Sequence, residues 1–162
     1  IIKLQELTNH KVGTTVSVGI INGGSRRNVV PEFCDIAIDT RAMTVPEVER
    51  LTAEIFALKP ILLGAELEIS GSFDRPPMER NALMIDTFNQ AKEIGAHYDL
   101  TLRDSGTGGG SDGNFTAALG VPTLDGLGVV GNDAHAVSEW VDLASLPRRA
   151  ALLAELLMDL GR

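Results

Sequence analysis

Two loop segments contain the groups of this sequence that could do chemistry. The first is the glycine loop GTGGGSDG, in which Gly108, Gly109 and Gly110 precede Ser111 and Asp112. Unshielded backbone N–H groups at the start of a helix form a site for anions. The loop lacks the lysine of a phosphate-binding P-loop and the glycine spacing of a dinucleotide site, so a carboxylate is the better ligand. A plain turn in which Asp112 caps the helix is the alternative.

The second segment, LGVVGNDAH, ends at His135 behind Asn132 and Asp133. A neutral imidazole held in a loop beside acidic groups can ligate zinc, although many loop histidines are simply solvated. The segments YDLTLRD and GVPTLDGLG flank a short helix, NFTAAL, and predict a parallel strand–helix–strand unit. Because ligands bind beyond the carboxyl ends of such strands, we expect the glycine loop and His135 to share one rim.

Several other polar side chains could bind a substrate carboxylate. Arginine does so through paired N–H groups, and the candidates are Arg41, Arg75 and the adjacent Arg26 and Arg27. Asn28 directly follows a turn and could present its amide to a ligand, or could simply form the turn. Each arginine could equally be an ordinary surface residue.

The elements that would position these groups begin with a hairpin. Val16, Val18 and Ile20 alternate with polar or small residues, which predicts a half-buried strand. The turn cluster NGGSRRN follows, and FCDIAIDTR alternates again, which predicts the antiparallel partner.

Helices are expected on both sides of this hairpin in the sequence. Ile1, Leu4 and Leu7 have helical spacing at the start of the chain. A second helix would be capped by Thr44, with Pro46 in its first turn. Pro60 would stop it, and ELEISGS would return as a third strand. The apolar stripe of this helix consists of Val48, Leu51, Ile55 and Leu58.

The second half of the chain predicts helices around the two loops. FDRPPM, with its two prolines, marks the expected crossing between domains. NALMIDTFNQAKEIG predicts a helix capped by Asn81 and closed by Gly95. Ser145 and Pro147 open the last helix, whose predicted inward face consists of Leu152, Leu153, Leu156 and Leu160.

Composition limits the classes of function. Of the 162 residues 44% are hydrophobic and 22% are charged, which is typical of a globular protein with a packed core. The net charge of −8 argues against binding to nucleic acid, and no apolar run reaches the ~20 residues of a membrane span. Cys34, the single cysteine, excludes an internal disulfide and fits a reducing, cytoplasmic location without proving it. Because the chain opens without Met and inside a helical pattern, we expect an N-terminally truncated fragment.

Together these segments resemble the aminoacylase and glutamate carboxypeptidase superfamily of dinuclear zinc hydrolases, metallopeptidase family twenty. GTTVSVGIINGGSRRNVVPEFCDIAIDTR is similar to the family's lid or dimerisation domain, with its glycine pair, Asn, apolar pair and Pro. GTGGGSDGNFTAALGVPTLDGLGVVG resembles the substrate-loop region, and GNDAHAVSEWVDLASLPRRAALLAELL resembles the closing segment with the last metal-binding histidine. The likeness covers essentially the whole chain, and the glycine loop is closest to the glutamate carboxypeptidase branch.

The resemblance implies an α/β fold class in two parts. Residues 1–74 would form an α+β lid domain with an antiparallel sheet and helices on one face, and residues 75–162 the C-terminal part of an α/β zinc-peptidase catalytic domain. The implied reaction is hydrolysis of an amide bond next to a free carboxylate in a peptide or small molecule. The implied cofactor is a pair of zinc ions, and the implied partner is a second copy bound through the lid.

The resemblance also assigns roles to single residues. His135 would ligate one zinc and Arg75 would bind the substrate carboxylate. The other substrate-binding positions would be Gly109, Gly110, Ser111, Asn28 and Arg41. The family's remaining metal ligands and its catalytic glutamate belong upstream, so we expect the isolated chain to be inactive. A stand-alone dimerisation or ligand-binding module without catalysis is the second hypothesis.

Overall fold

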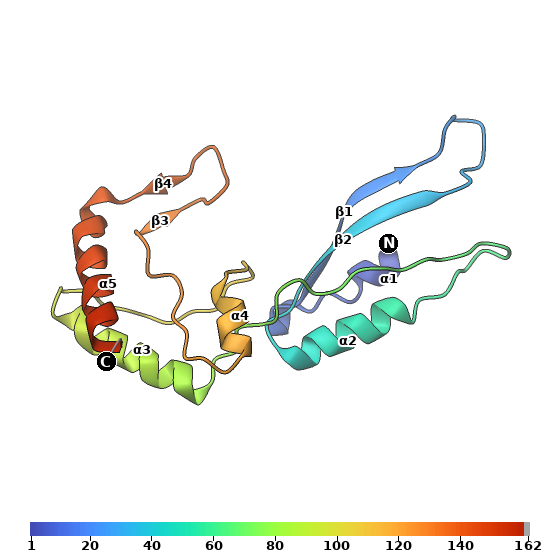
Figure 1. Ribbon diagram of the computed structural model, residues 1–162. Coiled ribbons are helices and arrows are strands. Elements are labelled where there is room, and N and C mark those ends of the chain that lie inside the picture. The colour runs from blue at the N-terminus through green and yellow to red at the C-terminus, as the bar shows by residue number, and fades with distance from the viewer. Residues whose placement is uncertain (161–162) are drawn as a thin grey trace. The chain divides into compact units, whose positions relative to one another are not determined.

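The computed structural model describes residues 1–160, except for the side chain of Leu160. By their contacts these residues divide into two compact units. The first contains Ile1–Glu79 together with Thr107–Gly110, and the second contains Arg80–Gly106 and the residues from Ser111 onward. The predicted domain boundary after residue 74 stays a prediction. Fold class is confirmed: helices combine with small antiparallel sheets (Figure 1).

The hairpin of the first unit pairs β1 (Thr15–Gly23) with β2 (Cys34–Arg41) in antiparallel register. Thr15 lies opposite Arg41, and Val18 lies opposite Ile38. A bulge between Val18 and Ile20 then shifts the register by one residue. The expected alternation through Ile20 is therefore wrong. A bulge reverses the order of faces, so Ile21 follows Val18 on one face and Ile20 points to the other.

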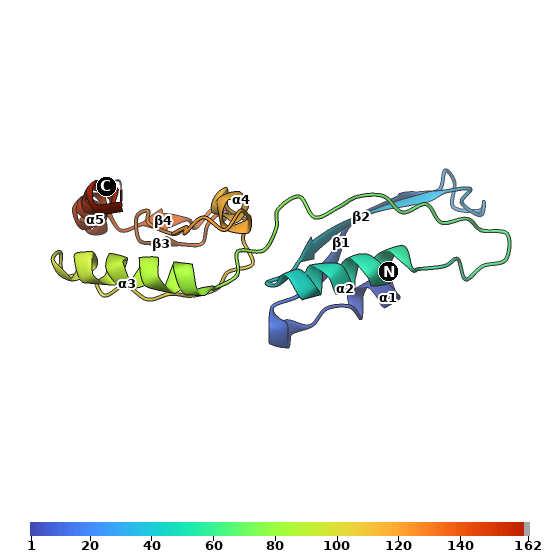
Figure 2. The same cartoon turned by 60° about the horizontal axis from the view of Figure 1, so that its bottom comes forward.

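Two helices cover one face of this hairpin near its open end (Figure 2). They are α1 (Ile2–Gln5), which is a single turn, and α2 (Val45–Phe56). Leu4, Val16 and Leu51 form the buried core of the unit. Leu51 is fully buried, as its place in the predicted stripe requires. Ile1 is exposed, so the expected helical face at the start of the chain is shorter than the pattern suggests.

The start of α2 is held differently from the prediction. Thr44 occupies the N-cap position, but its side chain makes no capping hydrogen bond. The first helical N–H, that of Val45, instead donates to Oε1 of Glu79 over 2.6 Å. Pro46 lies in the first turn as expected. The predicted third strand, residues 66–72, is irregular in the structure. An extended segment becomes a strand only where a neighbour supplies a hydrogen-bonded ladder, and residues 1–160 supply none there.

The second unit is built on α3 (Ala82–Ala96) packed against α5 (Leu146–Leu160). Asn81 caps α3 as predicted, because its Oδ1 accepts from the N–H of Met84 over 3.0 Å. Gly95 does not close the helix. It is buried inside the last turn, where an added β-carbon would lie 3.1 Å from Cδ1 of Leu102. The left-handed residue after the helix is Asp99, with φ 55.

The predicted inward face of α5 is partly correct. Leu152 is fully buried and Leu156 is 3% exposed, whereas Leu153 is 41% exposed. Helix geometry explains the error, because Leu153 lies about 100° around the axis from Leu152 and so faces away from α3. The predicted inward position of Leu160 lies outside the described side chains.

The two strands predicted on either side of the glycine loop are irregular segments, so the predicted parallel unit is not formed within residues 1–160. Their side chains nevertheless pack as the pattern requires. Leu100 and Leu102 from the first segment, and Leu124 and Leu127 from the second, contact the α3–α5 core. Between them lies the six-residue helix α4 (Gly113–Ala118). A short antiparallel pair, β3 (Gly131–Asn132) with β4 (Trp140–Val141), precedes α5. No helix among residues 1–160 is long and apolar enough to cross a membrane.

Candidate functional site

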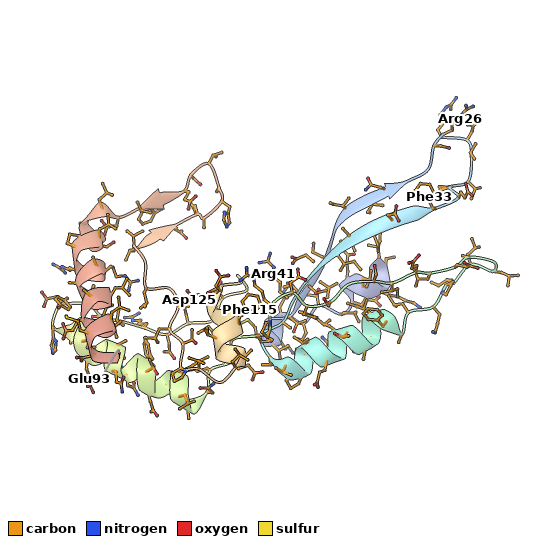
Figure 3. All side chains as sticks on the ribbon, viewed as in Figure 1. Arg26, Phe33, Arg41, Glu93, Phe115 and Asp125 are labelled. Carbon is orange, nitrogen blue, oxygen red and sulfur yellow. The ribbon has the colours of Figure 1, made fainter. Side chains whose placement is uncertain are left out.

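Two of the predicted arginines lie against the glycine turn, residues 107–110, within the first unit. Arg41, labelled in Figure 3, is the last residue of β2. Its Nη1 donates to the carbonyl oxygen of Gly108 over 3.2 Å. Arg75 passes Gly110 so closely that an added β-carbon there would lie 2.9 Å from its Cδ and 3.5 Å from its Nε. The structure therefore brings four predicted substrate residues together: Arg41, Arg75, Gly109 and Gly110.

Asp39 belongs to the same cluster, although the sequence analysis did not select it. Its Oδ1 accepts a hydrogen bond from Nε of Arg41 over 2.9 Å. The two residues are separated by one position on β2, and side chains two apart on a strand share a face. An Asp-x-Arg triplet on a predicted strand was thus the available signal for this pair.

The glycine loop uses several of its own N–H groups internally. The N–H of Gly109 donates to Oγ1 of Thr107 over 3.2 Å. In the second unit, the N–H of Ser111 donates to Oδ1 of Asn114 over 2.9 Å, and that of Gly113 donates to Oγ of Ser111 over 3.0 Å. An anion that used these three N–H groups would have to replace those bonds. Asp112 stands at the N-cap position of α4 without a side-chain capping hydrogen bond, so the alternative interpretation of the loop, a plain turn in which Asp112 caps the helix, is not supported.

The segment that enters the glycine loop is held in the second unit by an ion pair. Nε of Arg80 lies 2.6 Å from Oδ2 of Asp104. Hydrogen bonding to this guanidinium holds the pKa of the Asp104 carboxyl below its usual range. The pair connects Arg80, two residues before α3, to Asp104, two residues before Gly106, where the glycine loop begins.

His135 lies in the loop between β3 and β4 of the second unit, with its side chain exposed. Its backbone is left-handed, with φ 70, as is that of Asp133, with φ 59. Left-handed backbone in residues other than glycine costs free energy and is frequent at ligand-binding positions. The glycine turn and His135 belong to different units, so their shared rim stays a prediction.

The remaining predicted residues lie in the loop that connects β1 and β2. Asn28 and Arg27 are exposed there, as is Arg26, which Figure 3 shows at the end of the hairpin. This end is distant from Arg41 along both strands, because Arg41 pairs with Thr15 at the opposite end of the ladder. The structure of the chain alone does not bring Asn28 to the glycine turn.

One His-x-Asp triplet occurs, at His97, Tyr98 and Asp99, and it has a structural role. Nδ1 of His97 lies 3.2 Å from Oε1 of Glu155 on α5, and the Tyr98 hydroxyl donates to Oε2 over 2.5 Å. The Tyr98 hydrogen bond, with His97 adding to it, lowers the pKa of the Glu155 carboxyl. These contacts fasten the end of α3 to α5.

No group of three or more His, Cys, Asp or Glu side chains suited to a metal ion occurs within residues 1–160. Catalytic zinc takes three protein ligands and a water. The described residues therefore do not make a complete zinc site, and His135 as a zinc ligand stays a prediction.

Comparison with known proteins identifies the family to which these features belong. The chain is 30% identical over 166 residues to a succinyl-diaminopimelate desuccinylase from Cereibacter sphaeroides, covering 97% of this chain and 42% of that protein. It is 29% identical over 149 residues to carboxypeptidase G2 from Pseudomonas sp. strain RS-16, covering 88% of this chain and 35% of that protein. The chain thus spans less than half the length of these relatives. Residues 4–159 match the family described as Peptidase family M20/M25/M40, and the chain belongs to this family of hydrolases.

Proposed function

We propose that this chain is part of a zinc-dependent hydrolase that cleaves an amide bond next to a free carboxylate. The observation that carries the proposal is the glycine turn, residues 107–110, flanked by the guanidinium groups of Arg41 and Arg75. Planar guanidinium groups bind carboxylates by paired hydrogen bonds, and Gly110 leaves room for one of them beside the backbone. Arg75 is the group that would bind the substrate carboxylate.

The names of the relatives support the same class of substrate. One relative is named for removing a succinyl group, which carries a free carboxylate, and the other is named a carboxypeptidase, which acts beside a terminal carboxylate. N-acyl amino acids, including acyl-glutamates, and peptides with an acidic C-terminal residue have this chemistry in common. The proposed substrate is a compound of this class.

The metal centre of this hydrolase would be completed outside the chain. His135 is the proposed zinc ligand, held on a left-handed loop with its imidazole exposed. Since residues 1–160 contain no cluster of three ligands, the other ligands of two zinc ions would come from the rest of a longer protein. On this proposal the 162-residue chain alone binds zinc weakly and hydrolyses nothing.

The hairpin of the first unit would also make a homodimer contact. Beyond the bulge, large apolar side chains are exposed on both faces, with Ile20 56% and Ile21 55% exposed. Val30 and Phe33 in the connecting loop are exposed as well. Within residues 1–160 this sheet has two strands, so each strand has one edge without a ladder partner there, and exposed apolar edges favour pairing with another chain.

The test uses a protein that contains this chain and has the length of its relatives. Zinc per chain would be measured by elemental analysis, and hydrolysis would be measured with N-succinyl and N-acyl-glutamate amides. About two zinc ions per chain with turnover supports the hydrolase. A protein of that length that binds no metal and hydrolyses none of these amides would leave the alternative, a dimerisation or ligand-binding module.

A further inference from the structure

Arg41 has two protein partners, and they come from segments far apart in the sequence. Nε is bound to Oδ1 of Asp39 at 2.9 Å, and Nη1 donates to the carbonyl oxygen of Gly108 at 3.2 Å. The backbone of Arg41 is itself fixed, because it pairs with Thr15 in the β1–β2 ladder. One side chain thus connects the rigid end of the hairpin to the glycine turn.

Arg41 contacts the backbone of the glycine turn through both its guanidinium and its aliphatic stem. A β-carbon added at Gly108 would lie 3.7 Å from Cδ of Arg41, so the arginine stem also packs against this residue. The next N–H, that of Gly109, is held by Thr107 within the turn. The turn is therefore fixed internally by Thr107 and externally by Arg41.

The charge of Arg41 is already compensated. The Asp39 carboxylate lies against its Nε, so a substrate carboxylate would meet a neutral pair instead of a free cation. The two side chains are 52% and 59% exposed, and exposed ion pairs contribute little to stability. The value of the pair lies in orienting the guanidinium and not in holding the fold together.

We infer that Arg41 is a positioning residue that sets the conformation of the glycine turn through Gly108, with Asp39 orienting its guanidinium. Arg75, which passes Gly110 at the other end of the turn, keeps the role of binding the substrate carboxylate that the proposed function gives it. This assignment replaces a direct substrate role for Arg41, and it rests on the proposed function only where activity is the readout.

The first test needs no activity. Amide hydrogen exchange of a peptide spanning residues 105–114 would be measured in the longer protein for Arg41→Ala, Arg41→Lys and Asp39→Asn. All three variants should exchange faster in this peptide. Alanine removes both donors, lysine lacks the planar fork that reaches Asp39 and Gly108 together, and asparagine removes the charge that orients the guanidinium. Arg148→Ala, on the exposed surface of α5, is the matched control and should leave the peptide unchanged. Unchanged exchange in Arg41→Ala would overturn the proposal even if the protein is an active hydrolase.

The second test separates positioning from substrate binding. Rates would be measured with an N-acyl-glutamate and with the same compound carrying a primary amide in place of its α-carboxylate. Arg41→Lys and Asp39→Asn should lower kcat by a similar factor, up to roughly 100-fold, for both compounds, because a displaced turn affects both. The double variant should be no worse than either single one. A rise in KM confined to the carboxylate compound would show direct substrate binding by Arg41 and refute the positioning role.

Discussion

The hydroxyl of Thr14 donates to Oε2 of Glu47 over 2.6 Å, and Thr14 is fully buried directly before β1. Arg50 completes the arrangement, because its Nη2 lies 2.8 Å from the same carboxylate oxygen and also donates to the carbonyl oxygen of Leu7 over 3.1 Å. Glu47 and Arg50, both on α2, therefore connect this helix to Thr14, just before β1, and to Leu7, just after α1.

This carboxylate should make the first unit sensitive to acid. Hydrogen bonds from Arg50 and then Thr14 lower the pKa of Glu47 from 4.5 to about 2. A group whose pKa is lower in the folded state contributes stability above its unfolded value, and the contribution is lost as pH falls. Urea midpoints measured between pH 4.5 and 2 should therefore fall less steeply in Glu47→Gln than in the parent protein.

The matched control for this prediction is Glu66→Gln, an exposed carboxylate in the irregular segment after α2. It should keep the parent's dependence on pH over the same range. Glu47→Gln should also be less stable than the parent at neutral pH, since the amide cannot accept charge-assisted hydrogen bonds. Parallel pH profiles for the parent and Glu47→Gln would contradict this account of the carboxylate.

Leu152 should dominate the stability of the second unit. Its side chain is fully buried against α3, in contact with Ala91 and Ile94 of the same core. Leu152→Ala removes this packing and leaves a cavity, which costs about 2–5 kcal/mol in unfolding free energy. Leu157→Ala on the same helix, at a side chain 69% exposed, should change stability by no more than about 0.5 kcal/mol in the 162-residue chain. Urea unfolding of both variants checks the difference.

Local patterns predicted the helices and the hairpin of this fold because both depend on short-range periodicity. Asn81 as a cap, Leu51 at the centre of its stripe and the β1–β2 pairing are all confirmed. The bulge between Val18 and Ile20 was missed because the alternation of side-chain types continues through it, although Gly19 inside the strand was an available signal. The segments around Leu100 and Leu124 have the side-chain packing of strands without a ladder, since pairing depends on a neighbouring backbone and not on their own residues.

In the candidate site, too, the residue types could be predicted from the sequence, whereas their contacts with distant segments could not. The glycine turn, Arg41 and Arg75 were recognisable as residue types, and the structure brings them together. The separate roles of the two arginines could not be predicted from the sequence, because the contact between Arg41 and Gly108 spans 67 positions. Whether His135 faces this turn depends on the relation between the two units, which no local pattern determines.

Gly110 should be the glycine of the loop most sensitive to substitution. In Gly110→Ala the new β-carbon would meet Cδ of Arg75 at 2.9 Å, so the arginine has to move. In the active, longer protein we expect both Gly110→Ala and Arg75→Ala to raise KM for an N-acyl-glutamate, with a smaller change for the α-amide analogue. Gly109→Ala is the control, because its β-carbon would meet only Oγ1 of Thr107, at 3.6 Å. An equal rise in KM in Gly110→Ala and Gly109→Ala would contradict the explanation through Arg75.

His135 is the residue on which the metal assignment depends. In the longer protein, His135→Ala should lower zinc occupancy and activity by at least ~10-fold, as expected when a metal shell is disturbed. His97→Ala is the matched control, because His97 is also exposed but is engaged by Glu155 between α3 and α5. It should keep the parent's zinc content measured by elemental analysis. If His135→Ala retains full zinc while remaining folded by circular dichroism, the imidazole is not a ligand, and the left-handed loop around Asp133 serves another purpose.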